Sequence, residues 1–442
     1  MAGEDLESTA PIPVVGSATA TVNPPRRPWT RLIIFILIGV IVWPAAFWSG
    51  WTFQRTWSAS NGEPTSVIVA TWMRDNRMGP VVAQLENLYY RYVDKPKVGG
   101  EPTISADVSQ EDAAGADTSD VGIASAPTPA TSVTSASPSP SAIRPHLQPP
   151  PPLISPVSDP EPLEGQWQPV ASKVDGQSAI YVTRVRADVE HSSYYASVMW
   201  IDTLLTKALF VPGYEEPAGG PNPYNGALPE SLWPFVLANF NGAFRLEDSM
   251  GGYAYDGNVV APLVEGKGTT VFYRDGSIKV GKWGRDFDTV TPDMVAVRQN
   301  LNLIVDRGES KVNSATDNVI WGATTDKESL AWRAAIGQRD DGSIIYIGSP
   351  YLSAKGLADT LVSAGVKEAM VLDMNNWWTA GFYFRHAKDG APKCRKLEPT
   401  IPEGCDRFLR PYKRDSFQFL GNPSSGALDA VWPVPQASST TP

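Results

Sequence analysis

The sequence predicts an α+β fold that is strand-rich, with a mixed or antiparallel sheet and few helices. Three Asp-Gly pairs support this, because Asp-Gly between apolar or alternating segments is the strongest short-range hairpin signal. They are Asp256-Gly257, Asp275-Gly276 and Asp341-Gly342. No GxGxxG motif follows a predicted strand, and strands do not alternate regularly with helices, so a Rossmann fold is disfavoured.

The first predicted element is a membrane anchor. No charged residue lies between Arg31 and Arg55, and this stretch is long enough to cross a bilayer core as a helix. Three arginines flank its N-terminal side, at 26, 27 and 31, and one flanks its C-terminal side. The positive-inside rule therefore predicts a cytoplasmic tail over 1–31, a single-pass anchor over 32–54 and an extracytoplasmic main domain in the cell membrane. A cleaved signal peptide is the alternative.

Two short helices and a linker are predicted next. Apolar residues recur at helical spacing over 62–93, with a break at Met78-Gly79-Pro80. The stretch 94–164 contains no aromatic residue and is rich in proline, serine and alanine, so it cannot bury a core. We expect a disordered, extended linker there and one globular domain over 165–432.

One clear helix follows the last hairpin. Ser353 is its candidate N-cap, and Gly365 is placed to end it. Its apolar face consists of Leu357, Ala358, Leu361 and Val362. The segment KEAMVLD then predicts a short buried strand, which places Asp373 at a strand's carboxyl end. In open α/β sheets such ends commonly carry ligand chemistry.

Composition excludes some classes of function. The net charge of −10 leaves no basic surplus to neutralise phosphates, which argues against a nucleic-acid partner. Three histidines and two cysteines show no metal-ligand spacing, so no cofactor is predicted, while a metal held by carboxylates alone stays open. We expect Cys394 and Cys405 to form a disulfide in an oxidising compartment, with a pair of free thiols as the alternative.

Candidate polar residues lie in four stretches, and each has a structural alternative. Asn241 either binds a ligand's hydroxyl groups or bonds the backbone of its own turn. Arg298 is a candidate anion ligand. Arg333 is the only charge in an apolar run, so it faces either a structural carboxylate or a phosphate. Asp306 follows an apolar run and fits a surface turn, and Asp373 either carries chemistry or accepts hydrogen bonds in a turn.

Several ordered strings resemble the phosphodiester glycosidase family. NFNGAF, AWRAAIGQRDDGSIIYIG and VLDMNN carry the resemblance, which covers roughly residues 165–385. The strings GGYAYDG, VGKWGRD, AVRQNL and WMRDNRMGPVVAQLE resemble its membrane-anchored actinobacterial branch. The resemblance implies a glycosidase-type hydrolase acting on glycosyl phosphodiesters or related cell-envelope glycans. The lysosomal uncovering enzyme, which removes N-acetylglucosamine from a sugar phosphodiester, is the best-known member of that family.

The sequence departs from the family at two places. Ala334 replaces a threonine that follows the arginine, and the residues after Asp373 replace a loop of glycines and a serine. Glycines there would let backbone N–H groups approach a phosphate. The replacing residues are Met374, Asn375, Asn376, Trp377 and Trp378.

The resemblance implies a role for each candidate. Cleavage of a glycosyl phosphodiester needs a carboxylate as base or nucleophile, and cations or donors on the phosphate. Asp373 suits the first role, with Glu247 or Asp306 as a second carboxylate. The expected substrate-binding residues are Asn241, Arg298, Arg333, Asn375, Asn376, Trp377 and Trp378, with the indoles stacking on a sugar. The alternative is a non-catalytic envelope domain that binds a glycan or a membrane-protein partner.

Overall fold

The computed structural model describes residues 43, 46–58, 63–92, 96–109, 144–313, 320–321, 330–374 and 376–434. The chain divides into two units, Met1–Asn76 and Arg77–Pro442. The α-helices with defined bounds are α2 (Thr65–Asp75), α3 (Gly79–Tyr92), α5 (Leu246–Ser249) and α6 (Ala354–Ser363), and residues 46–58 are also helical. The short 3₁₀ helices with defined bounds are η1 (Glu230–Phe235), η3 (Arg407–Leu409) and η4 (Asp429–Val431).

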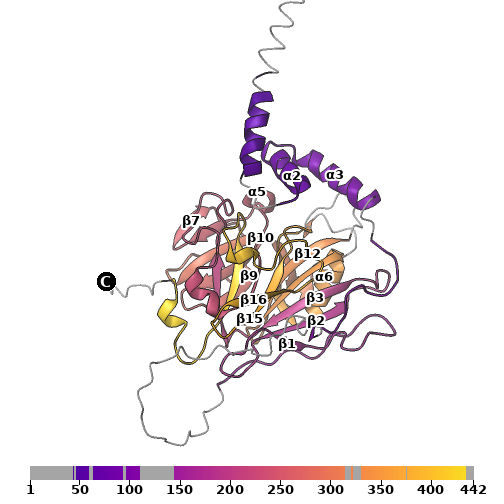
Figure 1. Cartoon of the computed structure of the whole chain (residues 1–442), viewed down its shortest axis with the longest axis vertical. Coiled ribbons are helices and arrows are strands. Elements are labelled where there is room, and N and C mark those ends of the chain that lie inside the picture. Colours follow the sequence, from indigo (N-terminus) through magenta and orange to yellow (C-terminus); the bar gives the residue numbers. More distant parts are fainter. Residues whose placement is uncertain are drawn as a thin grey trace, which may run out of the picture. The chain divides into compact units, whose positions relative to one another are not determined.

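The second unit is built around two sheets (Figure 1). The strands of the larger sheet are β1 (Gln168–Val170), β2 (Ile180–Arg186), β3 (Tyr195–Ile201), β6 (Tyr253–Tyr255), β7 (Asn258–Ala261), β8 (Lys267–Tyr273), β9 (Ile278–Lys282), β10 (Met294–Asp306), β11 (Glu309–Ser310), β12 (Ala331–Arg339), β13 (Ile344–Leu352) and β14 (Val366–Val371). Those of the smaller sheet are β4 (Thr206–Val211), β5 (Val236–Asn241), β15 (Gly381–His386), β16 (Pro392–Lys396) and β17 (Ser416–Gly421).

The strand order explains how the sheets are built. The strand order of the larger sheet is β1-β2-β3-β13-β12-β14-β10-β6-β7. In addition, β11 and β8 each pair with β10, and β9 pairs with β8. The smaller sheet runs β16-β15-β5-β17-β4. Every pairing between these named strands is antiparallel, so the part of the chain that is described is a strand-rich antiparallel domain with few helices.

The three predicted Asp-Gly hairpins are confirmed. They join β6 to β7, β8 to β9 and β12 to β13. Asp256 and Gly257 both have positive φ, at 48° and 77°. A two-residue turn of that kind matches the twist of its strands, and glycine adopts positive φ without a steric cost.

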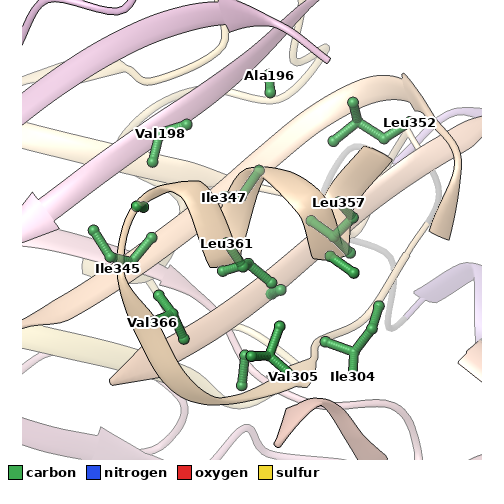
Figure 2. Close-up of a cluster of buried hydrophobic side chains, with 14 of the residues drawn as sticks. Ala196, Val198, Ile304, Val305, Ile345, Ile347, Leu352, Leu357, Leu361 and Val366 are labelled. Atoms are coloured by element: carbon green, nitrogen blue, oxygen red, sulfur yellow. The ribbon is translucent and has the colours of Figure 1, made fainter. Parts of the chain in front are cut away.

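Helix α6 covers one face of the larger sheet and forms a core cluster with it. The predicted N-cap is confirmed, because the Ser353 hydroxyl accepts a hydrogen bond from Gly356 N–H at 2.9 Å. Figure 2 shows Leu357 and Leu361 pointing at side chains from several strands. The sheet residues labelled there are Ala196, Val198, Ile304, Val305, Ile345, Ile347, Leu352 and Val366.

The structure corrects the predicted membrane-spanning helix. Of 32–54, residues 32–42 and 44–45 lie outside the described residues, as does the expected tail over 1–31. Among the described helices, none combines the length and the apolarity needed to span a membrane. The expected single-pass placement and extracytoplasmic location are corrected together with the helix.

Two segments of the predicted linker pack onto the sheet domain instead. Ala106 and Val108 are buried, and Val108 N–H donates to the Gln168 side chain at 3.0 Å. Leu153 belongs to the α6 cluster, and its N–H donates to Gly165 O at 2.9 Å. The composition rule failed here because a few apolar residues in an otherwise polar stretch are enough to dock it on an existing core. Residues 110–143 of the linker lie outside the described residues.

The predicted disulfide between Cys394 and Cys405 is present. It joins β16 to a loop, with a sequence separation of 11. We expect the variant with Cys394→Ser and Cys405→Ser to lose about 3 kcal/mol of unfolding free energy, because the bond restricts the unfolded chain. Urea unfolding measures this, and the reduced parent protein should match the variant. A loss well under 1 kcal/mol would contradict the prediction.

Glu398, inside the disulfide loop, predicts a pH dependence of stability. Its carboxylate accepts from Ser197 Oγ at 2.9 Å and Thr400 Oγ1 at 2.8 Å, yet burial dominates and raises its pKa above 4.5. The folded state therefore holds this proton after the unfolded chain has released it. Stability is full below the unfolded pKa and falls as pH rises toward the folded pKa.

We expect Glu398→Gln to flatten that fall, because the amide stays neutral. The difference in unfolding free energy between variant and parent, followed from pH 4 upward in urea, measures the contribution of this one group. If the difference does not grow with pH, the assignment is wrong.

Candidate functional site

Asp373 lies where the two sheets meet. β14 ends at Val371, and Leu372 N–H still donates to Ala334 O of β12 at 2.8 Å. The next N–H, that of Asp373, donates instead to Gly242 O at 3.0 Å. Gly242 directly follows β5 of the smaller sheet. The strand-end position that the sequence predicts for Asp373 is therefore also a junction between the sheets.

The Asp373 carboxylate has two described partners. Its Oδ1 accepts from Met374 N–H at 2.9 Å, and its Oδ2 accepts from Arg414 Nη2. The residue is 6% exposed. Burial raises the pKa of Asp373 to about 6, although Arg414 and the Met374 N–H oppose the rise and Asp248 and Asp415 add to it. A carboxyl group with this pKa exchanges its proton near neutral pH.

Arg414 and Asp415 were missed by reasoning from the sequence. They lie directly before β17, and the Asp415 Oδ2 accepts from Arg298 Nε at 2.8 Å, with both side chains buried. The Arg414 guanidinium lies 5.2 Å from the centre of the Trp378 ring. The only local signal is a run of charges, Lys413-Arg414-Asp415, before an apolar strand, and this run lies beyond the stretch that resembles the family.

Asn241 is close to Asp373, but its side chain is already used. Its Oδ1 accepts from Tyr346 Oη at 2.8 Å and from Ala380 N–H at 3.2 Å. Its Nδ2 donates to Gly242 O at 3.0 Å and lies 3.4 Å from Asp373 O. These bonds hold the Asp373 backbone, so they fit the structural alternative stated for Asn241.

The structure separates Arg333 from this group of residues. Its Nε donates to Leu352 O at 2.9 Å and its Nη1 to Trp321 O at 3.0 Å, and both acceptor residues belong to the α6 cluster. Burial lowers the pKa of Arg333 to about 10. Its Nη2 is buried without a partner among the described residues, and none of the contacts described for Arg333 is to Asp373.

The two expected second carboxylates lie elsewhere. Glu247, on α5, has a 64% exposed side chain that pairs with Arg245 at 3.2 Å. Asp306, at the end of β10, pairs with Arg285, which also binds Glu368 at 2.9 Å. Neither is in described contact with Asp373, whereas Asp415 shares its surroundings.

The indoles after Asp373 are covered by cations. Trp377 and Trp378 are each 7% exposed. The Arg407 guanidinium lies 5.5 Å from the Trp377 ring centre, and Lys413 Nζ lies 5.1 Å from that of Trp378. Asn376 is half-buried in the turn, and Asn375 lies outside the described residues.

Within the described residues, no group of three or more histidine, cysteine, aspartate or glutamate side chains is arranged to hold a metal ion. The Asp373 surroundings offer instead two aspartates and two arginines, which are suited to proton transfer and to anion binding.

Comparisons with known proteins give only distant likenesses. No protein-family model and no curated protein matches the chain. The catalytic domain of zebrafish N-acetylglucosamine-1-phosphodiester alpha-N-acetylglucosaminidase, auto-inhibited by its pro-peptide, is similar at 15% identity and a TM-score of 0.35, over 58% of this chain and 87% of that one.

Two bacterial structures show comparable likeness. A hypothetical protein from Synechocystis is 12% identical with a TM-score of 0.35, over 57% of this chain and 64% of that one. A putative exported protein from Burkholderia pseudomallei is 11% identical with a TM-score of 0.29, over 53% and 75%. The chain thus has a weak structural likeness to a glycosidase catalytic domain, and no activity follows from a likeness of this strength.

Proposed function

We propose that the protein is a hydrolase of the phosphodiester glycosidase type, acting on glycosyl phosphodiesters or related glycans. The observation that carries the proposal is the Asp373 carboxyl group, which is buried, has a pKa of about 6 and contacts one arginine, Arg414. The strings that resemble the family support the same substrate class. The side chains of Asp373 and Arg414 keep 9% and 11% exposure, so one edge of the pair reaches solvent.

The pair suits hydrolysis of a substrate that carries a phosphate. A phosphate competes with Asp373 for the Arg414 guanidinium, whose planar donors bind such an anion well. The released Asp373 carboxylate then takes a proton from water while the water oxygen bonds to the anomeric carbon, or it bonds to that carbon itself and gives a glycosyl ester that water afterwards hydrolyses to the free sugar. In both routes the bond between that carbon and the phosphate oxygen breaks, and the phosphomonoester leaves with the electron pair.

The test is an incubation of the purified chain with glycosyl phosphodiesters, followed by assays for free sugar and phosphomonoester. The proposal expects both products in equal amounts, at a rate that rises with pH around 6 as Asp373 loses its proton. Release of neither product from a panel of hexose and N-acetylhexosamine phosphodiesters would overturn it.

The second candidate is binding of an anionic glycan without turnover. The positive charge gathered around Trp377 and Trp378 favours it, because cationic side chains attract an anionic ligand whether or not the ligand is cleaved. Calorimetric titration with the same phosphodiesters separates the candidates, since binding that leaves the ligand intact supports this one.

A further inference from the structure

One glycine joins Asp373 to Asp415. Gly242 N–H donates to Asp415 O at 2.9 Å, and Gly242 O accepts from Asp373 N–H at 3.0 Å. A Cβ added to Gly242 would lie 2.5 Å from Cγ and Oδ1 of Asp415, so a side chain there would displace the carboxylate. The absence of a side chain at 242 therefore lets the Asp415 carboxylate pack against the end of β5.

The Asp415 carboxylate is only half satisfied. Its Oδ2 pairs with Arg298, but its Oδ1 is buried and has no hydrogen-bond partner among the described residues. A buried carboxylate oxygen without a hydrogen bond lowers the stability of the folded state. If the Arg298–Asp415 pair served only to stabilise the fold, leaving Asp415 Oδ1 without a partner would bring no advantage. Arg298 is itself held by Gln299 O at 2.9 Å and by Phe244 O, so the carboxylate cannot turn to share its second oxygen with that arginine without losing the first bond.

We propose that Asp415 is a positioning residue for Asp373. Anchored by Arg298 and Gly242, it fixes the chain so that the preceding residue, Arg414, reaches the Asp373 carboxylate. Its negative charge then sets how strongly Asp373 keeps its proton. The proposal deepens the proposed function, since it rests on Asp373 as the reacting group.

The electrostatic surroundings of Asp373 support this role. Burial raises the pKa of Asp373 most, Arg414 lowers it, and Asp248 and Asp415 raise it. Further charged and titratable groups act on Asp373, Arg414 or Asp415, and they are Glu216, Arg245, Asp248, Tyr253 and Arg298. Removing the Asp415 charge takes away a repulsion and also one of the carboxylates that interact with Arg414, so both effects favour the ionised form of Asp373.

The experiment follows the Asp373 carboxyl carbon by ¹³C NMR as a function of pH, in the parent and in Asp415→Asn. The asparagine keeps the size of the side chain and an oxygen for Arg298. We expect the Asp373 midpoint to fall by about half a pH unit or more. Asp359→Asn, an exposed change on α6, is the matched control and should leave the midpoint unchanged. An Asp373 midpoint equal to that of the parent in Asp415→Asn would overturn the proposal.

A second measurement does not depend on a variant. If Asp415 acts on Asp373 through its charge, the two carboxyl signals of the parent titrate as a coupled pair, and each shows a step at the midpoint of the other. If the Asp373 carboxyl signal titrates in a single step, with no change at the midpoint of Asp415, the proposal is overturned. This outcome counts even where Asp415→Asn fails to fold. Neither NMR measurement requires catalytic turnover. If the protein shows no hydrolase activity but the two carboxyl groups titrate as a coupled pair, the proposed function is wrong and the effect of Asp415 on Asp373 still holds.

Discussion

Asp373→Asn is expected to lower kcat/KM on a glycosyl phosphodiester by about 10²–10⁴-fold, the range that a general acid or base contributes. The amide has the shape of the carboxylate but can neither accept a proton nor attack the anomeric carbon. In the parent, kcat/KM should fall as pH drops below about 6, because Asp373 then becomes protonated. Initial rates across pH 5–8 measure both effects.

The control for this prediction is Asp359→Asn, whose carboxylate pairs with Lys355 on the exposed face of α6. It should keep the parent's rate and pH profile. Circular dichroism and urea unfolding must show that Asp373→Asn is folded, since the change leaves Arg414 without its carboxylate. An Asp373→Asn protein that is folded and hydrolyses the substrate as fast as the parent would rule out the catalytic role.

Arg298→Met is expected to cost about 3–5 kcal/mol of unfolding free energy at neutral pH, the usual result of removing one partner from a buried pair. Arg298 and Asp415 are 0% and 1% exposed, so the carboxylate left behind cannot reach water. Burial already raises the pKa of Asp415, and the loss of Arg298 raises it further. The cost should therefore shrink as pH falls and Asp415 takes up a proton.

Urea unfolding at several pH values measures this cost. The double variant with Arg298→Met and Asp415→Asn should recover part of the loss, because no buried charge remains. Lys355→Met is the matched control, since it breaks an exposed pair on α6 and should change stability by less than about 1 kcal/mol. A loss no larger than the control's would show that the buried pair contributes little.

The sequence was most informative where the structure depends on neighbouring residues. The turn at Asp256-Gly257 needs positive φ, which glycine adopts readily. A short stretch of sequence was therefore enough to predict the hairpin. The cap at Ser353 likewise depends on a residue only three positions away, Gly356. The linker was predicted from composition alone, and composition does not show which apolar residues pack into a core.

The candidate site depends on contacts between distant residues, which local sequence patterns do not predict. Asp373 could be singled out because it ends an apolar strand, and Asn241 because it ends another. Arg414 could not, because it lies 41 positions from Asp373 along the chain and meets it only through the pairing of β5 with β17. Arg333 shows the reverse: its sequence context suggested a structural carboxylate or a phosphate as its partner, but its described contacts are with backbone carbonyls of the α6 cluster.

By itself, then, the sequence determined the strand-rich character, the hairpins, helix α6, the disulfide and the position of Asp373 at a strand end. All but the disulfide depend on backbone preferences or on patterns within a few residues, and the disulfide was expected from the two cysteines and an oxidising compartment. Only the tertiary structure decided that Arg414 and Asp415 surround Asp373, that Glu247 and Asp306 do not, and that the pKa of Asp373 is raised. Those properties depend on burial and on charges brought together from distant strands, and no local pattern records which strands will meet.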